Sequence, residues 1–407
     1  MLDTMSTDEL RAAMVEGIAE RHEKIGMVLD ADIARALLTV PRHLFTEDDA
    51  DLKTAYEDTA IITKRDERGI STSSVSAPWL QSVMIGQAEL KPGDRVMEIG
   101  SGGYNAALIR EIVGPSGSVT SVDIDPEITA RAVRCLARAG YDDVEVVCAD
   151  AEFVLDGGRT FDAIIVTVGS WDIPPAWAEQ LAEGGRLVVP VRFKGMTRSW
   201  LLEQRDGHLV SRDHKMCGFV PMRGAGEHRG TGIPLLDDPR VGLWLDERDG
   251  IDTAELAGVL DLARVETWTG ITVGAGVVFS DQDLWLATTM PGFCLITCSQ
   301  QAIDDGVVAL PWQFGTPAFV DGPNLTYRPK PRKVNDEVYE FGAFAHGPRA
   351  QETAQLLADQ IAAWDRAGRP APRLSVRPAG TPDADLPDGY VLDKRHSRLV
   401  ISWPSAR

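Results

Sequence analysis

The sequence predicts an α/β fold in its first half and a separate α+β domain in its second half. From residue 95 to residue 191, short apolar segments alternate with segments of helical periodicity, a pattern typical of a parallel, doubly wound sheet. After about residue 226, this rhythm gives way to short alternating runs and one long helical segment. The chain has 407 residues, more than a single hydrophobic core usually serves. We therefore expect two domains, residues 1–226 and residues 227–407.

The first elements of the chain are expected to be helices. Residues 6–24 carry apolar side chains at helical spacing, and Ser6 with Glu9 has the spacing of a capping box. A second, shorter helix is expected over residues 30–38, ahead of the stretch "VPRHLF" at 40–45. These elements form an N-terminal helical segment in front of the α/β pattern.

The α/β pattern consists of strands and helices in alternation. Helices are expected at 103–113 and 126–139, and a third is expected in "PPAWAEQLAEGG", where the glycines act as the stop signal. A hairpin is expected around Asp206-Gly207. The strands of this domain are expected in "RVMEI", "SVTSVDI", "VEVVCA", "FDAIIVTV" and "RLVVPV".

The second domain is expected to combine strands with one clear helix. Apolar residues at helical spacing place that helix at residues 348–366. A stretch rich in Pro, Gly and Asp at 368–388 favours a loop, and "RLVISW" at 398–403 favours a last strand. Shorter alternating runs occur earlier, in "TWTGITV", "GVVFS", "DLWLATTM" and "FCLITCS".

The charge and the apolar pattern exclude several classes of protein. The formal net charge of −20 argues against sequence-independent nucleic-acid binding, because that affinity comes from neutralising phosphates. No apolar run reaches about 18 residues, so no membrane span is expected. The N-terminus "MLDTMSTDELRAAM" lacks the basic and then apolar pattern of a signal peptide. We expect a cytoplasmic protein without a nucleic-acid or membrane partner.

The cysteines and histidines do not form a metal-binding pattern. The 5 cysteines are odd in number, scattered and without a CxxC pair, so reduced thiols are expected. None of the 7 histidines has metal-ligand spacing, and His43 in "VPRHLF" is expected to be structural. The pairs Asp123/Asp125 and Asp281/Asp283 are interpreted as turn and cap residues rather than calcium ligands. No metal site is predicted.

The stretch "RVMEIGSGGYNAAL" at residues 95–108 has the outline of a cofactor loop. A strand, a tight glycine turn and a helix let the backbone approach a ligand and present free N–H groups. Gly100, Gly102 and Gly103 do not satisfy G-x-G-x-x-G, and the Gly-Lys-Ser/Thr of a P-loop is missing. The loop by itself therefore leaves the ligand open.

Acidic residues at three consecutive strand ends narrow the choice of ligand. Asp123 stands where a carboxylate can accept hydrogen bonds from both ribose hydroxyls, and Asp150 stands where an adenine amino group needs an acceptor. Glu98 can either organise the loop or face the positive groups of the ligand. The three carboxylates together suit a cationic, phosphate-free nucleoside better than a pyrophosphate, although each alone can instead cap the helix that follows.

Several stretches in matching order make residues 35–225 resemble the protein-L-isoaspartate O-methyltransferases. The resemblance implies a Rossmann-like class I fold, S-adenosylmethionine (SAM) as cofactor, and methylation of a peptide carboxylate. A carboxylate is already a nucleophile at neutral pH, so this reaction needs alignment and desolvation rather than acid–base groups. The stretches are "VPRHLF", "SAPWLQSVM", "LKPGDRVMEIGSGGY", "FDAIIVTV", "LAEGGRLVVPV" and "GFVPMRG".

The same resemblance implies the roles of individual residues. Ser76 matches the serine that faces the substrate carboxylate, although it can also serve as a helix N-cap ahead of Pro78. Thr167 matches a threonine that follows the fourth strand of the family. The predicted cofactor-binding residues are Glu98, Gly100, Ser101, Gly102, Tyr104, Asp123, Ile124, Asp150, Ala151 and Thr167.

Two departures from the family point to a narrower function. The loop Gly-Ser-Gly-Gly-Tyr is one residue shorter than the usual Gly-x-Gly-x-Gly-Tyr, and the chain continues for about 180 residues beyond "FVPM". The stretches "RPKPRKVNDEVYEFGAFAHGP" and "KRHSRLVISWP" resemble a subgroup that accompanies ribosomally made, modified peptides: lanthipeptides, graspetides and lasso peptides. This resemblance implies methylation of an ordinary aspartate in a constrained precursor peptide, leading to aspartimide or isoaspartate.

Two alternative functions stay open at this point. Within the same family, the enzyme can repair damaged proteins by methylating isoaspartate. In another class, the chain can be a non-catalytic, peptide-binding partner with an inactive SAM fold, which the intact acids and glycine loop argue against. The C-terminal domain is expected to recognise the substrate, and its tryptophans either form that surface or pack in the core.

Overall fold

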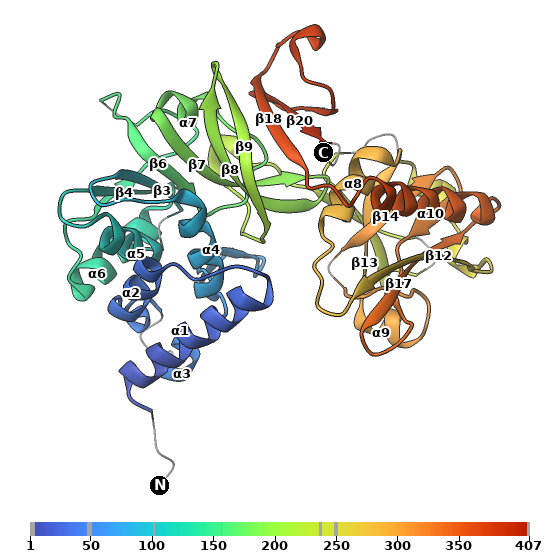
Figure 1. Cartoon of the computed structure of the whole chain (residues 1–407), viewed down its shortest axis with the longest axis horizontal. Coiled ribbons are helices and arrows are strands. Elements are labelled where there is room, and N and C mark those ends of the chain that lie inside the picture. The colour runs from blue at the N-terminus through green and yellow to red at the C-terminus, as the bar shows by residue number, and fades with distance from the viewer. Residues whose placement is uncertain are drawn as a thin grey trace.

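The computed structural model describes residues 5–46, 51–100, 102–155, 157–235, 238–247, 251–313 and 315–404. These residues confirm the predicted α/β fold, with its N-terminal helical segment and a further sheet-rich region towards the C-terminus (Figure 1). Within them, the strands form one ten-stranded sheet, one eight-stranded sheet and one two-stranded ribbon. The helices pack on both faces of the first sheet and on the second.

The N-terminal helices begin where the sequence predicts. Ser6 caps the first helix, and both hydrogen bonds of its capping box with Glu9 are present. Asp30 caps the second helix by accepting hydrogen bonds from two backbone N–H groups. The helices of this segment are α1 (Thr7–Lys24), α2 (Ala31–Thr39), the 3-10 turn η1 (Arg42–Phe45) and α3 (Leu52–Ala55).

The ten-stranded sheet contains a parallel centre and antiparallel additions. Strands β7, β6, β3, β4 and β5 run parallel, whereas β8 and β9 form the predicted hairpin around Asp206-Gly207. The spatial order is β19 (Tyr390–Asp393), β20 (Ser397–Ser402), β18 (Arg373–Pro378), β9 (His208–Met216), β8 (Met196–Arg205), β7 (Leu181–Phe193), β6 (Phe161–Val166), β3 (Arg95–Ile99), β4 (Ser118–Asp123) and β5 (Glu145–Cys148).

The sheet separates two apolar cores because successive strand residues point to opposite faces. In β6, for example, Ile164 and Val166 join one core, and Ala163 and Ile165 join the other. Helices α1, α2, α4 (Pro78–Ala88), α5 (Tyr104–Val113) and α6 (Pro126–Ala139) cover the second of these cores. The first core continues into the second half of the chain, so both halves share buried side chains.

The segment "PPAWAEQLAEGG" folds differently from the prediction. Helix α7 covers only Pro175–Glu179, and β7 starts at Leu181. Leu181 pairs with Phe161 at the start of β6 and is buried, so strand pairing overrides the helical pattern. The expected glycine stop at Gly184 and Gly185 instead falls inside the strand, next to a register shift.

The second sheet is antiparallel throughout. Its order is β10 (Thr231–Pro234), β11 (Val241–Leu245), β13 (Phe293–Cys298), β14 (Thr316–Asp321), β15 (Asn324–Tyr327), β17 (Val338–His346) and β12 (Val265–Gly274), and β16 (Arg332–Lys333) pairs with β17. The predicted long helix is α10 (Ala350–Arg366), accompanied by α8 (Asp281–Thr289) and α9 (Gln300–Asp304). The run "DLWLATTM" thus belongs to a helix rather than a strand, and acids in its first turn favour that helix.

The last strands return to the first sheet. Ser375 pairs with Val210 and Val376 pairs with Leu209, so β18 continues the sheet beyond β9, as the red and green strands of Figure 1 show. The expected C-terminal unit, residues 227–407, therefore does not coincide with one sheet. Two further strands form a separate ribbon, β1 (Ile61–Arg65) and β2 (Ser71–Val75). No described helix is long and apolar enough to cross a membrane.

Candidate active site

The three predicted acids lie along the carboxyl edge of the parallel strands. Glu98 pairs with Ser121 across β3 and β4, and Asp123 pairs with Cys148 across β4 and β5. A hollow at this edge is lined by five predicted residues, which are Gly100, Asp123, Ile124, Asp150 and Ala151. Ser101 lies outside the described residues. We call the Gly100 loop with Glu98, Asp123 and Asp150 the cofactor edge.

The loop after β3 requires glycine at its first position. Gly100 has φ +102°, and a Cβ there would stand 2.5 Å from Thr167 Oγ1. That hydroxyl donates hydrogen bonds to the carbonyls of Ile99 (3.0 Å) and Gly100 (2.9 Å). The side chain of Thr167 therefore fixes the shape of the loop, and a cofactor can approach the bare backbone of Gly100.

Glu98 is fully buried beneath the loop. Ser121 Oγ donates a 2.5 Å hydrogen bond to its carboxylate. Burial raises the pKa of Glu98 to about 7, while polar contacts with Ser121 and Asn105 oppose the rise. Glu98 does not line the hollow, so its geometry favours the loop-organising role of the two that the sequence allowed.

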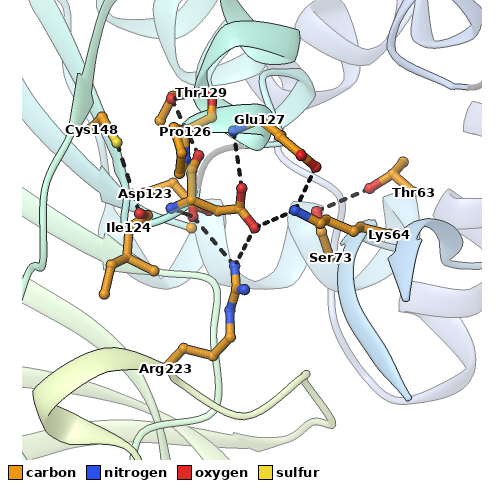
Figure 2. Close-up of polar contacts among 12 residues, drawn as sticks. Thr63, Lys64, Ser73, Asp123, Ile124, Pro126, Glu127, Thr129, Cys148 and Arg223 are labelled. Atoms are coloured by element: carbon orange, nitrogen blue, oxygen red, sulfur yellow. Dashed lines mark hydrogen bonds and ion pairs between the residues drawn. The ribbon is translucent and has the colours of Figure 1, made fainter. Parts of the chain in front are cut away.

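Asp123 is part of a network of acids and bases that Figure 2 shows. Its Oδ1 accepts a 2.9 Å hydrogen bond from the backbone N–H of Asp125 and lies 3.9 Å from the Arg223 guanidinium. Asp125 pairs with both Lys64 (2.8 Å) and Arg223 (3.1 Å). Burial raises the pKa of Asp125, but hydrogen bonds from Lys64, Glu127 N–H and Arg223 outweigh it and lower the pKa to about 2.

Asp150 is held by backbone groups. Its carboxylate accepts hydrogen bonds from Glu152 N (3.0 Å) and Ala225 N (2.9 Å). Residues 221–225 thus lie across the hollow, whose volume is about 40 Å³. Pro221, Met222 and Arg223 of this segment line the hollow, so the segment would border a ligand held there.

Two cations at this edge were not predicted. Arg223 belongs to "GFVPMRG", a stretch that the sequence analysis quoted for the resemblance without assigning the arginine a role. Lys64 lies on β1, within a segment that shows no motif and no clear period. Both contact Asp125 because the ribbon and the 221–225 segment converge on α6, a proximity that no local pattern encodes.

Ser76 lies between β2 and the start of α4. The helix N-cap is Ala77, without a side-chain hydrogen bond, so the interpretation of Ser76 as the cap is wrong. Its hydroxyl makes no hydrogen bond with the part of the chain that the structure describes. The guanidinium of Arg42, in "VPRHLF", donates to the carbonyls of Ala55, Thr59 and Ser76, each at 2.9 Å. Arg42 is fully buried, so it positions the Ser76 backbone rigidly.

Tyr104 and His43 belong to the core beneath the site. The Tyr104 ring is fully buried, 5.6 Å from the Phe45 ring, and does not line the hollow, which argues against a direct side-chain contact with a cofactor. His43 Nδ1 lies 2.8 Å from the Tyr56 hydroxyl in a structural contact, as expected. Across the described ranges, no group of three or more His, Cys, Asp or Glu side chains could hold a metal ion.

The turn between β19 and β20 reaches loops at the same edge. The His396 backbone N–H donates to Asp172 (2.7 Å), and its ring Nε2 lies 2.7 Å from Glu152. Arg395 donates to the carbonyl of Ala225 at 2.6 Å. The C-terminal stretch "KRHS" therefore braces the segments that carry Asp150 and cross the hollow.

The donor set at the cofactor edge fits a cationic nucleoside. Asp123 and Asp150 offer acceptors for hydroxyl and amino groups, and Gly100 leaves the backbone open. The two cations near the hollow, Lys64 and Arg223, already pair with acids. These features match SAM better than a ligand with phosphates.

Comparisons with known proteins agree with this chemistry. The family model of protein-L-isoaspartate(D-aspartate) O-methyltransferase (PCMT) matches residues 13–227. A protein-L-isoaspartate O-methyltransferase of Methanopyrus kandleri is 35% identical over 212 residues, which cover 51% of this chain and 91% of that protein. The corresponding protein of Pyrococcus horikoshii is 37% identical over 206 residues, which cover 50% and 89%.

A solved structure resembles nearly the whole chain. It is described as a protein-L-isoaspartate O-methyltransferase and aligns with a TM-score of 0.50 and 22% identity, covering 90% of this chain and 96% of that one. The likeness concerns the fold alone, but it extends into the second half. Length beyond "FVPM" is therefore not by itself a departure from proteins described as protein-L-isoaspartate O-methyltransferases, although the sequence analysis treats it as one.

Proposed function

The chain belongs to the protein-L-isoaspartate(D-aspartate) O-methyltransferase family, and from this premise we propose that it methylates an aspartate side chain in a constrained, ribosomally made peptide. The broader activity, SAM-dependent carboxyl O-methylation, is that of the family. A purely non-catalytic role is accordingly not retained. The peptide class and the choice of an ordinary aspartate are the parts that we propose.

The cofactor edge can hold SAM and align a carboxylate with it. When bound, SAM supplies a methyl group on a positively charged sulfur. Asp123 and Asp150 would hold the ribose and adenine, and the bare backbone of Gly100 would lie against the cofactor. The Ser76 hydroxyl, on a backbone held by Arg42, would donate to one oxygen of the acceptor carboxylate and leave the other to attack.

The ester product explains why a constrained peptide is a suitable substrate. The backbone nitrogen of the following residue can attack the ester carbonyl, form a C–N bond and expel methanol, which gives an aspartimide. Water then opens the ring to isoaspartate or aspartate. A macrocycle that holds this nitrogen near the ester accelerates closure, because the reaction becomes a well-oriented intramolecular one.

The position of the turn "KRHS" carries the proposal. This turn lies within the stretch that resembles the peptide-modifying subgroup, and its contacts with Asp172, Glu152 and Ala225 bring it to the loops around the hollow. A segment that resembles this subgroup and braces the site can shape which carboxylate enters. The shortened glycine loop is a second difference at the same edge.

Repair of isoaspartate is the second candidate function. It is favoured by the curated relatives, which are protein-L-isoaspartate O-methyltransferases, and by the solved structure that shares the fold of both halves. Both candidates use the same cofactor and the same transfer to a carboxylate oxygen. They differ only in the acceptor.

Matched substrates separate the two candidates. A linear isoaspartyl peptide and a lactam-bridged cyclic peptide of the same composition, with an ordinary aspartate, are each incubated with enzyme and SAM. We expect mass spectrometry to show a methyl gain and then a net loss of water for the cyclic peptide, at a kcat/KM well above that of the linear one. The opposite ranking would establish repair instead.

A further inference from the structure

The C-terminal strands create a groove that shares no lining residue with the hollow at the cofactor edge. It lies between β9 and β18, with a volume of about 970 Å³. We propose that it binds an extended, acidic segment of the peptide substrate, outside the residue that is methylated. This inference rests on the proposed function, since it assumes that the substrate is a peptide. The basic residues of the groove are Arg205, Arg212, Arg369, Arg373 and Arg377.

The groove is one face of the sheet extension. Leu374 and Val376 of β18 are buried in the first core, so Arg373, Ser375 and Arg377 point to the opposite face. Leu209 of β9 is buried in the same core and pairs with Val376. The residues that alternate with these apolar positions all line the groove. Strand pairing thus places side chains more than 150 residues apart in the chain beside each other.

The charge of the groove differs from that of the molecule. Its lining holds five arginines but only two acids, Asp206 and Asp213, whereas the whole chain has a formal net charge of −20. Arg212 is committed to Glu89 and Glu203. Arg373 and Arg377, in contrast, form no ion pair within the described residues. Two uncommitted arginines on one strand face favour carboxylates as partners, because guanidinium and carboxylate groups match in geometry.

The outer edge of β9 suits an extended backbone. β18 pairs with β9 only at Leu209 and Val210, although β9 continues to Met216. Within the described chain, no strand pairs with the outer side of residues 212–216. Free backbone N–H and C=O groups along such an edge can pair with an added strand, as in β-augmentation. A peptide segment therefore fits this groove better than a compact ligand.

The groove lies within reach of the cofactor edge. Measured across the strands alone, β9 and β3 are four spacings apart in the sheet order, which is roughly 20 Å at about 4.8 Å per spacing. Val210 is level with Val96, towards the amino end of β3, so the distance from the groove to the cofactor edge is greater than this. An extended chain advances about 3.3 Å per residue, so about six residues bridge the distance across the strands alone. The acidic segment and the methylated aspartate should be separated by at least that number.

Direct binding tests the proposal. The probe is a fluorescein-labelled peptide of alternating Glu and Ser, and fluorescence anisotropy is measured with the full-length protein at low salt. We expect saturable binding that weakens at least about tenfold in R373E/R377E, because the variant loses charge-assisted hydrogen bonds to the peptide carboxylates and repels them. The control R68E/R134E makes the same charge change at exposed arginines elsewhere and should bind normally.

Three results would overturn the proposal. These are no binding by the wild type, equal weakening in both double variants, or tighter binding of a single-stranded oligonucleotide than of the acidic peptide. The neutral variant R373Q/R377Q and SAM titrations of every variant guard against misfolding. Because the variants leave the cofactor edge intact, unchanged SAM affinity confirms that the fold is preserved.

Methylation of the cyclic peptide without an acidic segment separates the two proposals. If the cyclic peptide is methylated but the acidic peptide does not bind, only the groove proposal is contradicted. If the acidic peptide binds but the cyclic peptide is not methylated, only the proposed function is contradicted. When both hold, joining the Glu-Ser segment to the cyclic peptide should lower KM without changing kcat. The effect should require a linker of about six residues or more.

Discussion

The cofactor edge and the basic groove differ in their charge and in how the chain assembles them. The cofactor edge gathers acids from the ends of strands that follow each other in sequence, within residues 98–150. The groove combines arginines from residues 205–212 with others from residues 369–377. The first is closed by buried contacts and glycine geometry, whereas the second is an open face with exposed charges.

This difference teaches where substitutions should be costly. At the cofactor edge, a side chain must fit among fixed neighbours, so small changes act on both folding and ligand binding. In the groove, Arg373 and Arg377 lie on a face opposite the core, and their loss should act on partner binding alone. Substitutions at the two sites test this contrast.

Gly100→Ala should have the largest effect. The added Cβ would stand 2.5 Å from Thr167 Oγ1 in a conformation that already disfavours side chains, and we expect SAM affinity to fall by more than about 100-fold. Isothermal titration calorimetry measures it. Gly114→Ala is the matched control, because Gly114 also has positive φ but has no atom within 4 Å of such a Cβ. Equal losses of SAM affinity in both variants would show that backbone strain alone, and not the contact with Thr167, causes the loss.

Glu98 should make stability depend on pH. Its pKa is raised from 4.5 to about 7 by burial, so between these values the folded state keeps a proton that the unfolded state has lost. Stability should therefore fall as pH rises through this window, by on the order of 3 kcal/mol in total. Urea unfolding of the wild type and Glu98→Gln should agree near pH 4.5 and diverge by pH 8, with the variant more stable. If the free energies of unfolding of the wild type and the variant depend on pH in the same way, the pKa of Glu98 is not raised in the folded state.

Asp123→Ala should weaken SAM binding by about 10- to 100-fold, which corresponds to about 1.5–3 kcal/mol for hydrogen bonds to a charged group. Calorimetry again provides the measurement. Asp143→Ala removes an acid that pairs with Arg110 far from the hollow, and it should leave SAM affinity unchanged. Unaltered affinity in Asp123→Ala would place the ribose elsewhere.

Ser76→Ala should separate turnover from cofactor binding. Loss of one hydroxyl that orients the acceptor carboxylate should lower kcat by about tenfold, with SAM affinity unchanged. Initial rates at saturating SAM give kcat, and calorimetry gives the affinity. Ser74→Ala, two residues earlier on β2, is the control. Full activity in Ser76→Ala would leave this serine without a role in the reaction.

Arg212→Ala should have the smallest effect on stability. Its pairs with Glu89 and Glu203 are partly exposed, and such pairs contribute about 0–1 kcal/mol. Urea unfolding should show a change within this range. A loss of several kcal/mol in the free energy of unfolding would contradict the contrast between the two sites, because it would show that the groove stabilises the fold.

Much of the fold and part of the site could be predicted from sequence. Helical periodicity located α5, α6 and α10 to within two residues, and Gly100, Asp123 and Asp150 line one hollow. The prediction failed where a segment had competing patterns. "PPAWAEQLAEGG" is helical in composition, yet its second half pairs with β6, and the neighbour that stabilises it is a strand 20 residues earlier.

Local patterns in the sequence predicted most strands and helices of the α/β region, the glycine at the loop and the acids at successive strand ends. These features depend on neighbours in the chain, and local periodicity encodes them. Only the tertiary structure decided that Arg42 holds Ser76, that Lys64 and Arg223 meet at Asp125, and that β18 returns to β9. An alternating pattern predicts that one face of a strand is buried. Hydrogen bonding and packing between distant segments then select the strand that pairs with it.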